Sequence, residues 1–400
     1  MKLTDTILAA ALTLTAAAPS TAATKKEPAL NPAARVNAIA FKFYAQEAGK
    51  GGNIFFSPYS LHTAFAMAYE GARGATAKEM AAVFAFPAAP ALRDGIGALE
   101  KDLKEAARGS DFGQANSFWA QEGYRFLPAY TGLLARKYKG EARTVNFMTA
   151  AELSRRAINT WTEERTKGKI KDLFKEGALT PLTRLVLVNA VYFKGSWLRP
   201  FAKEMTGEAD FTKPDGGKVK AQMMTFSAPA SLQYGETDDF QVLRLPYSGG
   251  GLAMLLALPK DGKPLRDVEK KLGPAALEEL RSVLAEDKVK VFLPRFKFNS
   301  GFDLNSGLAA LGMPKAFTDA ADFSGMDGTL NLYIQRAVHQ AFVEVNEEGT
   351  EAAAATGISM GLKSIGLGFS VFRADRPFLF FIEEKKTGLL LFMGKVEDPT

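Results

Sequence analysis

The sequence has no cysteine and only two histidines among its 400 residues. Without cysteine the chain forms no disulfide, and it carries no thiol nucleophile and no site for a lipid-modified cysteine. Zinc sites are mostly built from cysteine and histidine, so a zinc centre here would need an unusual set of carboxylate ligands. The chain also has no Asn-x-Ser/Thr glycosylation site. These absences exclude a disulfide-stapled fold and argue against a metalloprotein.

Common catalytic motifs are missing as well. The sequence contains no Gly-x-Ser-x-Gly, no His-Glu-x-x-His and no phosphate-binding loop. Residues Gly249 to Gly251 are followed by Leu252 to Leu258, whose length and composition predict a strand, whereas a phosphate-binding loop opens a helix. We therefore interpret these glycines as a hairpin and expect a protein that is not an enzyme and uses no cofactor.

The overall composition is that of an ordinary soluble globular protein, with 47% hydrophobic and 24% charged residues. No stretch after residue 35 has the composition of a linker, which favours a single large domain. The basic residues between Arg165 and Lys175 suggest a polyanion site, but acidic residues alternate with them. Such a mixture is typical of a solvated face, so we expect no nucleic-acid partner.

The N-terminus has the pattern of a signal peptide. Lys2 precedes an almost wholly apolar run from Ile7 to Ala18, and small residues follow as far as Ala22. Asp5 is atypical of such segments, and the alternative is an N-terminal helix. We assign residues 1–22 to the signal peptide and residues 31–400 to the folded domain, and no other segment is long enough to cross a bilayer. Export without disulfides or glycosylation sites favours a bacterial-type secreted or periplasmic protein.

The most informative segment lies between residues 337 and 363. Alternating apolar positions from Ala337 to Val345 predict a strand with one buried face, and the residues from Glu347 to Gly349 predict a turn that ends it. About twenty-five residues then precede the next apolar run, far more than an ordinary loop of about four to six. The central residues, Ala352 to Ala355, are small. An alanine-rich helix capped by Thr350 is the alternative, but it lacks an apolar stripe.

The small side chains suit a loop that enters a sheet as an additional strand, because bulky side chains would block that entry. Further blocks of sequence support this interpretation: Asn53–Ser60, Gly71–Thr76, Ile158–Thr162, Thr166–Ile170, Leu187–Trp197, Phe372–Ile382 and Leu391–Val396. With these blocks in this order, the chain after residue 30 resembles the serpin family. The resemblance implies an α+β fold in one large domain, with a main mixed sheet, two smaller sheets, about nine helices and an exposed reactive loop.

The resemblance also implies a set of functional residues. Counting along the loop from Glu347, the family's spacing places the reactive bond between Lys363 and Ser364, with cleavage after Met360 or Leu362 as alternatives. Its hinge consists of Glu347, Gly349, Thr350, Glu351, Ala352, Ala353, Ala354, Ala355 and Thr356. Its gating residues are Ser57, Asn189 and His339 in the shutter, Trp197 in the breach, and Arg295 as the ion-pair partner of Glu347.

The two histidines are interpreted differently. His339 lies in the middle of the predicted strand on its buried face, so it needs hydrogen-bond partners. His62 follows a helix start that we expect to be capped near Ser57 with Pro58 in the first turn, and we interpret it as a structural or surface residue.

The function that the resemblance implies is irreversible inhibition of serine proteases by a suicide-substrate mechanism. The protease would attack the loop, form a covalent acyl-enzyme, and be trapped when the loop inserts into the main sheet. Lys363 before the cut suits trypsin-like proteases, which have an aspartate in the specificity pocket. The alternatives are an inhibitor of chymotrypsin-like or cysteine proteases, and a non-inhibitory carrier, chaperone or storage protein. We expect a monomer whose partner is the target protease.

Overall fold

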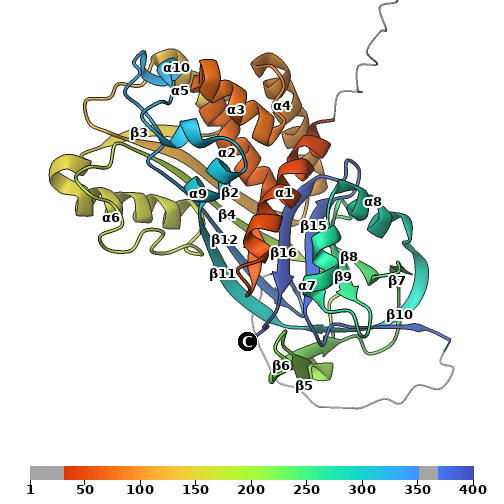
Figure 1. The fold of residues 1–400 in the computed structure, drawn as a ribbon. Coiled ribbons are helices and arrows are strands. Elements are labelled where there is room, and N and C mark those ends of the chain that lie inside the picture. Colours follow the sequence, from red (N-terminus) through yellow and green to blue (C-terminus); the bar gives the residue numbers. More distant parts are fainter. Residues whose placement is uncertain (1–30, 351–367) are drawn as a thin grey trace, which may run out of the picture. The chain divides into compact units, whose positions relative to one another are not determined.

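The main sheet is mixed, as predicted, and its strands come from distant parts of the chain (Figure 1). Within residues 31–350 and 368–400, which a computed structural model of the chain describes, this sheet has six strands. In spatial order they are β11 (Phe296–Asp303), β12 (Arg336–Asn346), β13 (Gly349–Thr350), β4 (Leu185–Ser196), β2 (Ser110–Gln121) and β3 (Glu141–Val145). The pairs β12–β4 and β2–β3 are parallel, and the others are antiparallel.

A strand, β12, is present where the alternation predicts it, but both of its faces are buried and not one alone. Ala337, His339, Ala341 and Val343 are completely buried, and they share one face of the strand. On the opposite face, Val338 and Phe342 are also buried, because helix α6 (Phe147–Arg165) and the segment after it cover that side. The strand is therefore packed on both faces.

A second sheet contains ten strands in the described part of the chain. Their bounds are β1 (Ile54–Phe56), β16 (Leu390–Val396), β15 (Phe378–Glu384), β9 (Leu252–Pro259), β8 (Phe240–Pro246), β7 (Ala230–Glu236), β10 (Ala285–Pro294), β6 (Lys218–Thr225), β5 (Gly207–Thr212) and β14 (Ser370–Arg373). Strand β10 pairs with β7, β6 and β14, so hydrogen bonds join the two smaller sheets that the resemblance implied into one. The glycines at 249–251 lie in the β8–β9 hairpin, as predicted, and Gly249 and Gly250 have φ of 86° and 73°.

Ten α-helices lie in the described residues, two of them only four residues long, where about nine helices were expected. Besides α6 they are α1 (Pro32–Ala48), α2 (Pro58–Gly71), α3 (Gly74–Phe84), α4 (Ala89–Ala106), α5 (Pro128–Tyr138), α7 (Leu265–Val268), α8 (Pro274–Ser282), α9 (Leu304–Ala310) and α10 (Ser324–Asp327). Three 3₁₀-helices complete the structure: η1 (Lys203–Met205), η2 (Glu269–Lys271) and η3 (Pro314–Phe317). As predicted, Ser57 caps α2, with its Oγ accepting a hydrogen bond from the Ser60 amide, and Pro58 opens the helix.

The described residues from Asn31 to Thr400 belong to one compact unit. The predicted signal peptide, residues 1–22, lies outside the described residues. Within residues 31–350 and 368–400, no helix combines the length and the apolar character that crossing a bilayer requires. The same residues contain no cluster of three or more His, Cys, Asp or Glu side chains that could hold a metal ion.

Candidate functional site

The candidate site is the boundary between β4 and β12, which we call the seam. At one end these strands pair directly, from Arg336 opposite Val186 to Phe342 opposite Tyr192. At the other end β13 separates them, and Thr350 pairs with both Val345 and Gly195. After β12 the chain turns and comes back between the two strands. β4 and β12 therefore pair directly over most of the seam, which we call its closed part. At the other end β13 separates them, and we call this the open end.

The closed part of the seam is held by a buried polar cluster. His339 on β12 lies directly opposite Asn189 on β4, and their side chains are hydrogen-bonded through Nδ1 and Oδ1. The other ring nitrogen, Nε2, accepts a hydrogen bond from the Ser57 amide at 3.1 Å. Asn189 donates to Ser60 Oγ at 2.5 Å and also to Asn116 Oδ1. We call Ser57, Ser60, Asn116, Asn189 and His339 the latch.

The latch requires a neutral histidine. Because Nε2 accepts a hydrogen bond, the ring proton is on Nδ1, which donates to Asn189. Burial lowers the pKa of His339 to about 3, since a charged ring would be desolvated there. His339 is thus uncharged at neutral pH, and both of its nitrogens are satisfied.

The open end of the seam is built around Trp197 and Tyr247. The Trp197 indole donates from Nε1 to the Asn346 carbonyl at 2.9 Å and stacks on the Tyr247 ring, with centroids 4.7 Å apart. The Tyr247 hydroxyl is in turn hydrogen-bonded to Thr350 Oγ1 at 2.7 Å. Complete burial raises the pKa of Tyr247, so the phenol stays protonated. Thr350 is only 1% exposed and is already part of the sheet.

An ion pair fixes the turn that leads into β13. Arg295 donates from Nε to both carboxylate oxygens of Glu347, at 2.7 and 2.8 Å, and Thr206 Oγ1 donates to the same carboxylate. Burial raises the pKa of Glu347, but the hydrogen bonds from Arg295 and Thr206 outweigh this, and the pKa lies below its ordinary value. Glu347 is therefore ionised and anchored at neutral pH.

The next residue after the turn has to be a glycine. A Cβ at Gly349 would lie 2.0 Å from the backbone oxygen of Gly195 on β4, well inside van der Waals contact. Any side chain at this position would push β13 away from β4. The sequence predicts a hinge of small residues. At Gly349, the first of them in the sheet, the reason for the small size is steric.

The structure brings the expected gating residues to two places along the seam. Ser57, Asn189 and His339 meet at the closed part, whereas Trp197, Arg295 and Glu347 lie at the open end. The expected reactive bond Lys363–Ser364 and the expected hinge residues from Glu351 to Thr356 lie outside the described residues. His62 is buried in α2 against the rings of Phe84 and Phe86, so it is structural and not a surface residue.

Several residues of the site were not expected from the sequence. Tyr247, Thr206 and Asn116 are separated by tens of residues from the side chains that they contact. No spacing pattern within the sequence indicates contacts between residues that are so far apart along the chain. A buried asparagine facing another asparagine could be suspected only once β2 and β4 were known to pair, with Asn116 opposite Asn189.

Comparison with known proteins agrees with this geometry. The family profile described as Serpin (serine protease inhibitor) matches residues 34–399. An uncharacterized serpin-like protein of Thermococcus kodakarensis is 40% identical over 380 residues, covering 94% of this chain and 87% of that protein. Leukocyte elastase inhibitor A of Mus musculus is 38% identical over 364 residues, covering 88% and 95%. The crystal structure of uncleaved ovalbumin superimposes with a TM-score of 0.82 at 29% identity, covering 92% and 100%.

The fold and the seam, in which β13 lies between β12 and β4, therefore define a serpin-type protein. The chain belongs to the serpin family of serine protease inhibitors.

Proposed function

We propose that this protein inhibits trypsin-like serine proteases irreversibly, by inserting its cleaved reactive loop into the main sheet. The observation that carries the proposal is the placement of β13 between β12 and β4. The chain already enters the seam at Thr350, and the following residues, Ala352 to Ala355, are small enough to continue the same strand. The position of β13 therefore supports an additional strand that would continue from Thr350 between β12 and β4.

The proposed chemistry begins in the protease. Its serine oxygen attacks the carbonyl carbon of Lys363, and the Lys363–Ser364 amide breaks. Lys363 becomes the acyl group of an ester with the protease, and the Ser364 nitrogen takes up a proton and leaves as a new N-terminus. The hinge is then free at one end and can move into the seam while the protease stays attached.

Continuing β13 in its present register specifies the strand pairing that we propose for the inserted state. Each further hinge residue advances one position along both neighbouring strands. Six residues beyond Thr350, Thr356 reaches His339 on β12 and Asn189 on β4. Alternation places Thr356 on the same face as Thr350, which is the face of the latch. Insertion would therefore replace the direct bond between His339 and Asn189.

The driving force would come from the added strand. Each inserted residue can make ladder hydrogen bonds to β4 and β12, and the small apolar side chains leave water. The intact protein is then a kinetically trapped state in which the latch and the direct β4–β12 pairing must first be broken. The relative named leukocyte elastase inhibitor supports an inhibitory function, and Lys363 supports the trypsin-like target.

A denaturing gel tests the proposal directly. Incubation with trypsin is expected to give a band of the combined mass that survives denaturation, and trypsin lacking its catalytic serine is the matched control that gives none. Cleavage in the loop by a non-target protease should raise the melting temperature by tens of degrees, because the released hinge inserts. Cleaved and intact protein that melt together would show that no insertion takes place.

We further propose that residues 1–22 direct export and are removed. The support is the charged and apolar pattern of that segment. Expression in a bacterium followed by fractionation should give a periplasmic or secreted protein whose N-terminus lies just after Ala22 or Ala23. Recovery of the intact N-terminus in the cytoplasmic fraction would overturn the assignment.

A further inference from the structure

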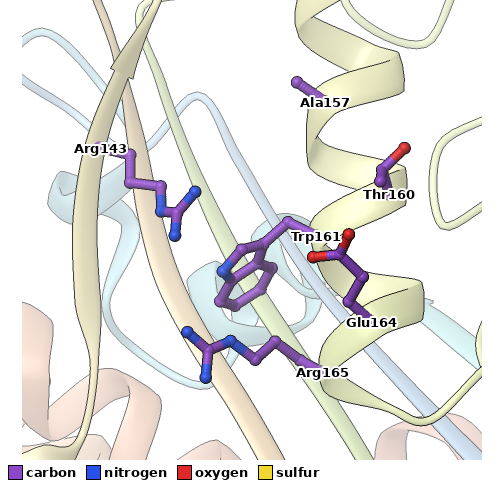
Figure 2. Close-up of a pocket in the computed structure, with 6 residues that line it drawn as sticks. All are labelled: Arg143, Ala157, Thr160, Trp161, Glu164 and Arg165. Carbon is purple, nitrogen blue, oxygen red and sulfur yellow. The ribbon is translucent and has the colours of Figure 1, made fainter.

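A pocket separate from the seam lies between β3 and α6 and has a cavity volume of about 580 Å³. This size suits a small organic molecule. Figure 2 shows its lining: Arg143 from β3, and Ala157, Thr160, Trp161, Glu164 and Arg165 from α6. The spacing of the α6 residues places most of them on one face of the helix. The pocket is thus a gap between an edge strand and the helix that covers the main sheet.

One wall of the pocket is rich in hydrogen-bond donors. The guanidinium groups of Arg143 and Arg165 lie on either side of the Trp161 indole, 6.0 and 5.9 Å from its ring (Figure 2). Both arginines pair with one carboxylate, that of Glu141, and their side chains are about half exposed. The Trp161 Nε1 is buried and has no acceptor within the described part of the chain. The two guanidinium groups therefore offer more donors than the Glu141 carboxylate alone can satisfy.

The lining also includes an acceptor. Glu164 lines the same pocket from α6, together with the hydroxyl-bearing Thr160 and the small Ala157. A carboxylate there disfavours a compact polyanion, because a second negative charge would face it. It favours a molecule that has an anionic group at one end and a hydrogen-bond donor at the other.

We propose that this pocket binds a small aryl carboxylate that carries a hydroxyl donor. The ligand carboxylate would accept charge-assisted hydrogen bonds from the N–H groups of Arg143 and Arg165 that Glu141 does not engage, and its hydroxyl would donate to Glu164. Its ring would lie against the aliphatic stems of the arginines and Ala157. We choose 4-hydroxybenzoate as the probe, because benzoate lacks its hydroxyl and phenol lacks its carboxylate.

Direct binding tests this site without any protease. The protein has three tryptophans, so its indole N–H groups give three NMR signals, and Trp161→Phe identifies the one at the pocket. We expect 4-hydroxybenzoate to shift that signal saturably, benzoate to bind more weakly, and phenol to bind least. Arg143→Gln and Arg165→Gln should each weaken 4-hydroxybenzoate about ten-fold, and Glu164→Gln should remove the preference over benzoate.

The matched control is Arg156→Gln. Arg156 lies on the same helix and is similarly exposed, and it pairs with Glu152; neither residue lines the pocket. Its loss should leave binding unchanged. Absence of saturable binding at millimolar probe, equal binding of phenol, or an Arg156→Gln effect equal to that of Arg165→Gln would each overturn the site.

Occupation of the pocket has a consequence that rests on the proposed function. Helix α6 shares an apolar cluster with both strands of the seam, since Ile158 belongs to the same cluster as Val188 of β4 and Phe342 of β12. Adding a strand to the seam would require α6 to shift. A ligand that bonds to Arg143 of β3 and Arg165 of α6 would hold the helix to the sheet and oppose that shift.

Saturating 4-hydroxybenzoate should slow trypsin complex formation by wild-type protein and leave Arg165→Gln unaffected. Binding without slowing would refute this consequence alone, because the NMR titration contains no protease.

Discussion

His339 and Asn189 are the only side chains of the latch that face each other directly across the pairing of β12 with β4. The hydrogen bond between them spans the two strands that a new strand would have to separate. Their other bonds, to Ser57 and Ser60, connect the same point to the start of α2. Opening the seam at this level therefore breaks a polar network that water does not reach.

Loss of the latch histidine should make the seam open more readily. His339→Ala leaves the Asn189 carbonyl and the Ser57 amide without their partner, at about 1–3 kcal/mol. On mild heating we expect faster conversion to polymeric or latent forms on native gels. His62→Ala is the matched control, because His62 is equally buried but lies away from the seam in α2. Equal conversion rates for His339→Ala and His62→Ala would show that the loss of any buried ring, and not the loss of the latch, makes the seam open faster.

Acid should destabilise the folded protein through both histidines. Burial lowers the pKa values of His339 and His62 from 6.5 to about 3, with Arg35 also disfavouring the charged form of His62. Between pH 6.5 and 3 the unfolded chain binds more protons, so the free energy of unfolding falls as pH falls. Each histidine should contribute a slope of about 1.4 kcal/mol per pH unit. Urea unfolding from pH 7 to 4 should be less steep in pH for either alanine variant, and unchanged slopes would contradict the burial argument.

In the structure, the expected hinge residue Thr350 makes a specific contact. Thr350 is buried and hydrogen-bonded to Tyr247, so Thr350→Arg would bury a guanidinium in place of a small hydroxyl. We expect the fold to persist, the hinge to leave the sheet, and the variant to be cleaved by trypsin as a substrate. The ratio of complex to cleaved product on a denaturing gel measures this. Thr350→Ser, which retains the hydroxyl, should remain an inhibitor, and undiminished trapping by Thr350→Arg would refute the role of the hinge.

From the register of β13 we predict an effect that concerns only the cleaved protein. Thr356 is expected to reach the latch only after insertion, where its hydroxyl can bond to His339 or Asn189. Thr356→Leu should therefore lower the stability of cleaved protein by about 1–3 kcal/mol and leave the intact protein unchanged. Melting curves of the cleaved and the intact protein distinguish a loss specific to the inserted strand from a general loss of stability. Thr356→Ser, which keeps the hydroxyl, is the conservative control. An equal loss in the intact form would mean that the register is wrong.

Much of the fold could be predicted because its signals are local. The two-residue alternation of β12, the Ser57 cap and the hairpin glycines each depend on neighbours in sequence. The contact of Tyr247 with Thr350 joins residues 103 apart, and nothing near either residue indicates it. Only the resemblance to a family suggested that Arg295 lies beside Glu347. Contacts across a sheet depend on strand order, which one sequence does not specify.

In the proposed mechanism the residue before the reactive bond decides which protease is trapped, and the expected residue, Lys363, lies outside the described residues. An ammonium entering a specificity pocket must be desolvated, which is tolerable only opposite a carboxylate such as that of trypsin-like enzymes. Lys363→Leu should therefore shift inhibition from trypsin to chymotrypsin, and loop insertion should persist because the hinge is unchanged. N-terminal sequencing of the fragment released from the wild-type trypsin complex should begin at Ser364. A fragment that begins at Gly361 or Lys363 would move the bond to one of the alternative positions, after Met360 or Leu362. Trapping of trypsin by Lys363→Leu at the wild-type rate would show that Lys363 does not determine the target.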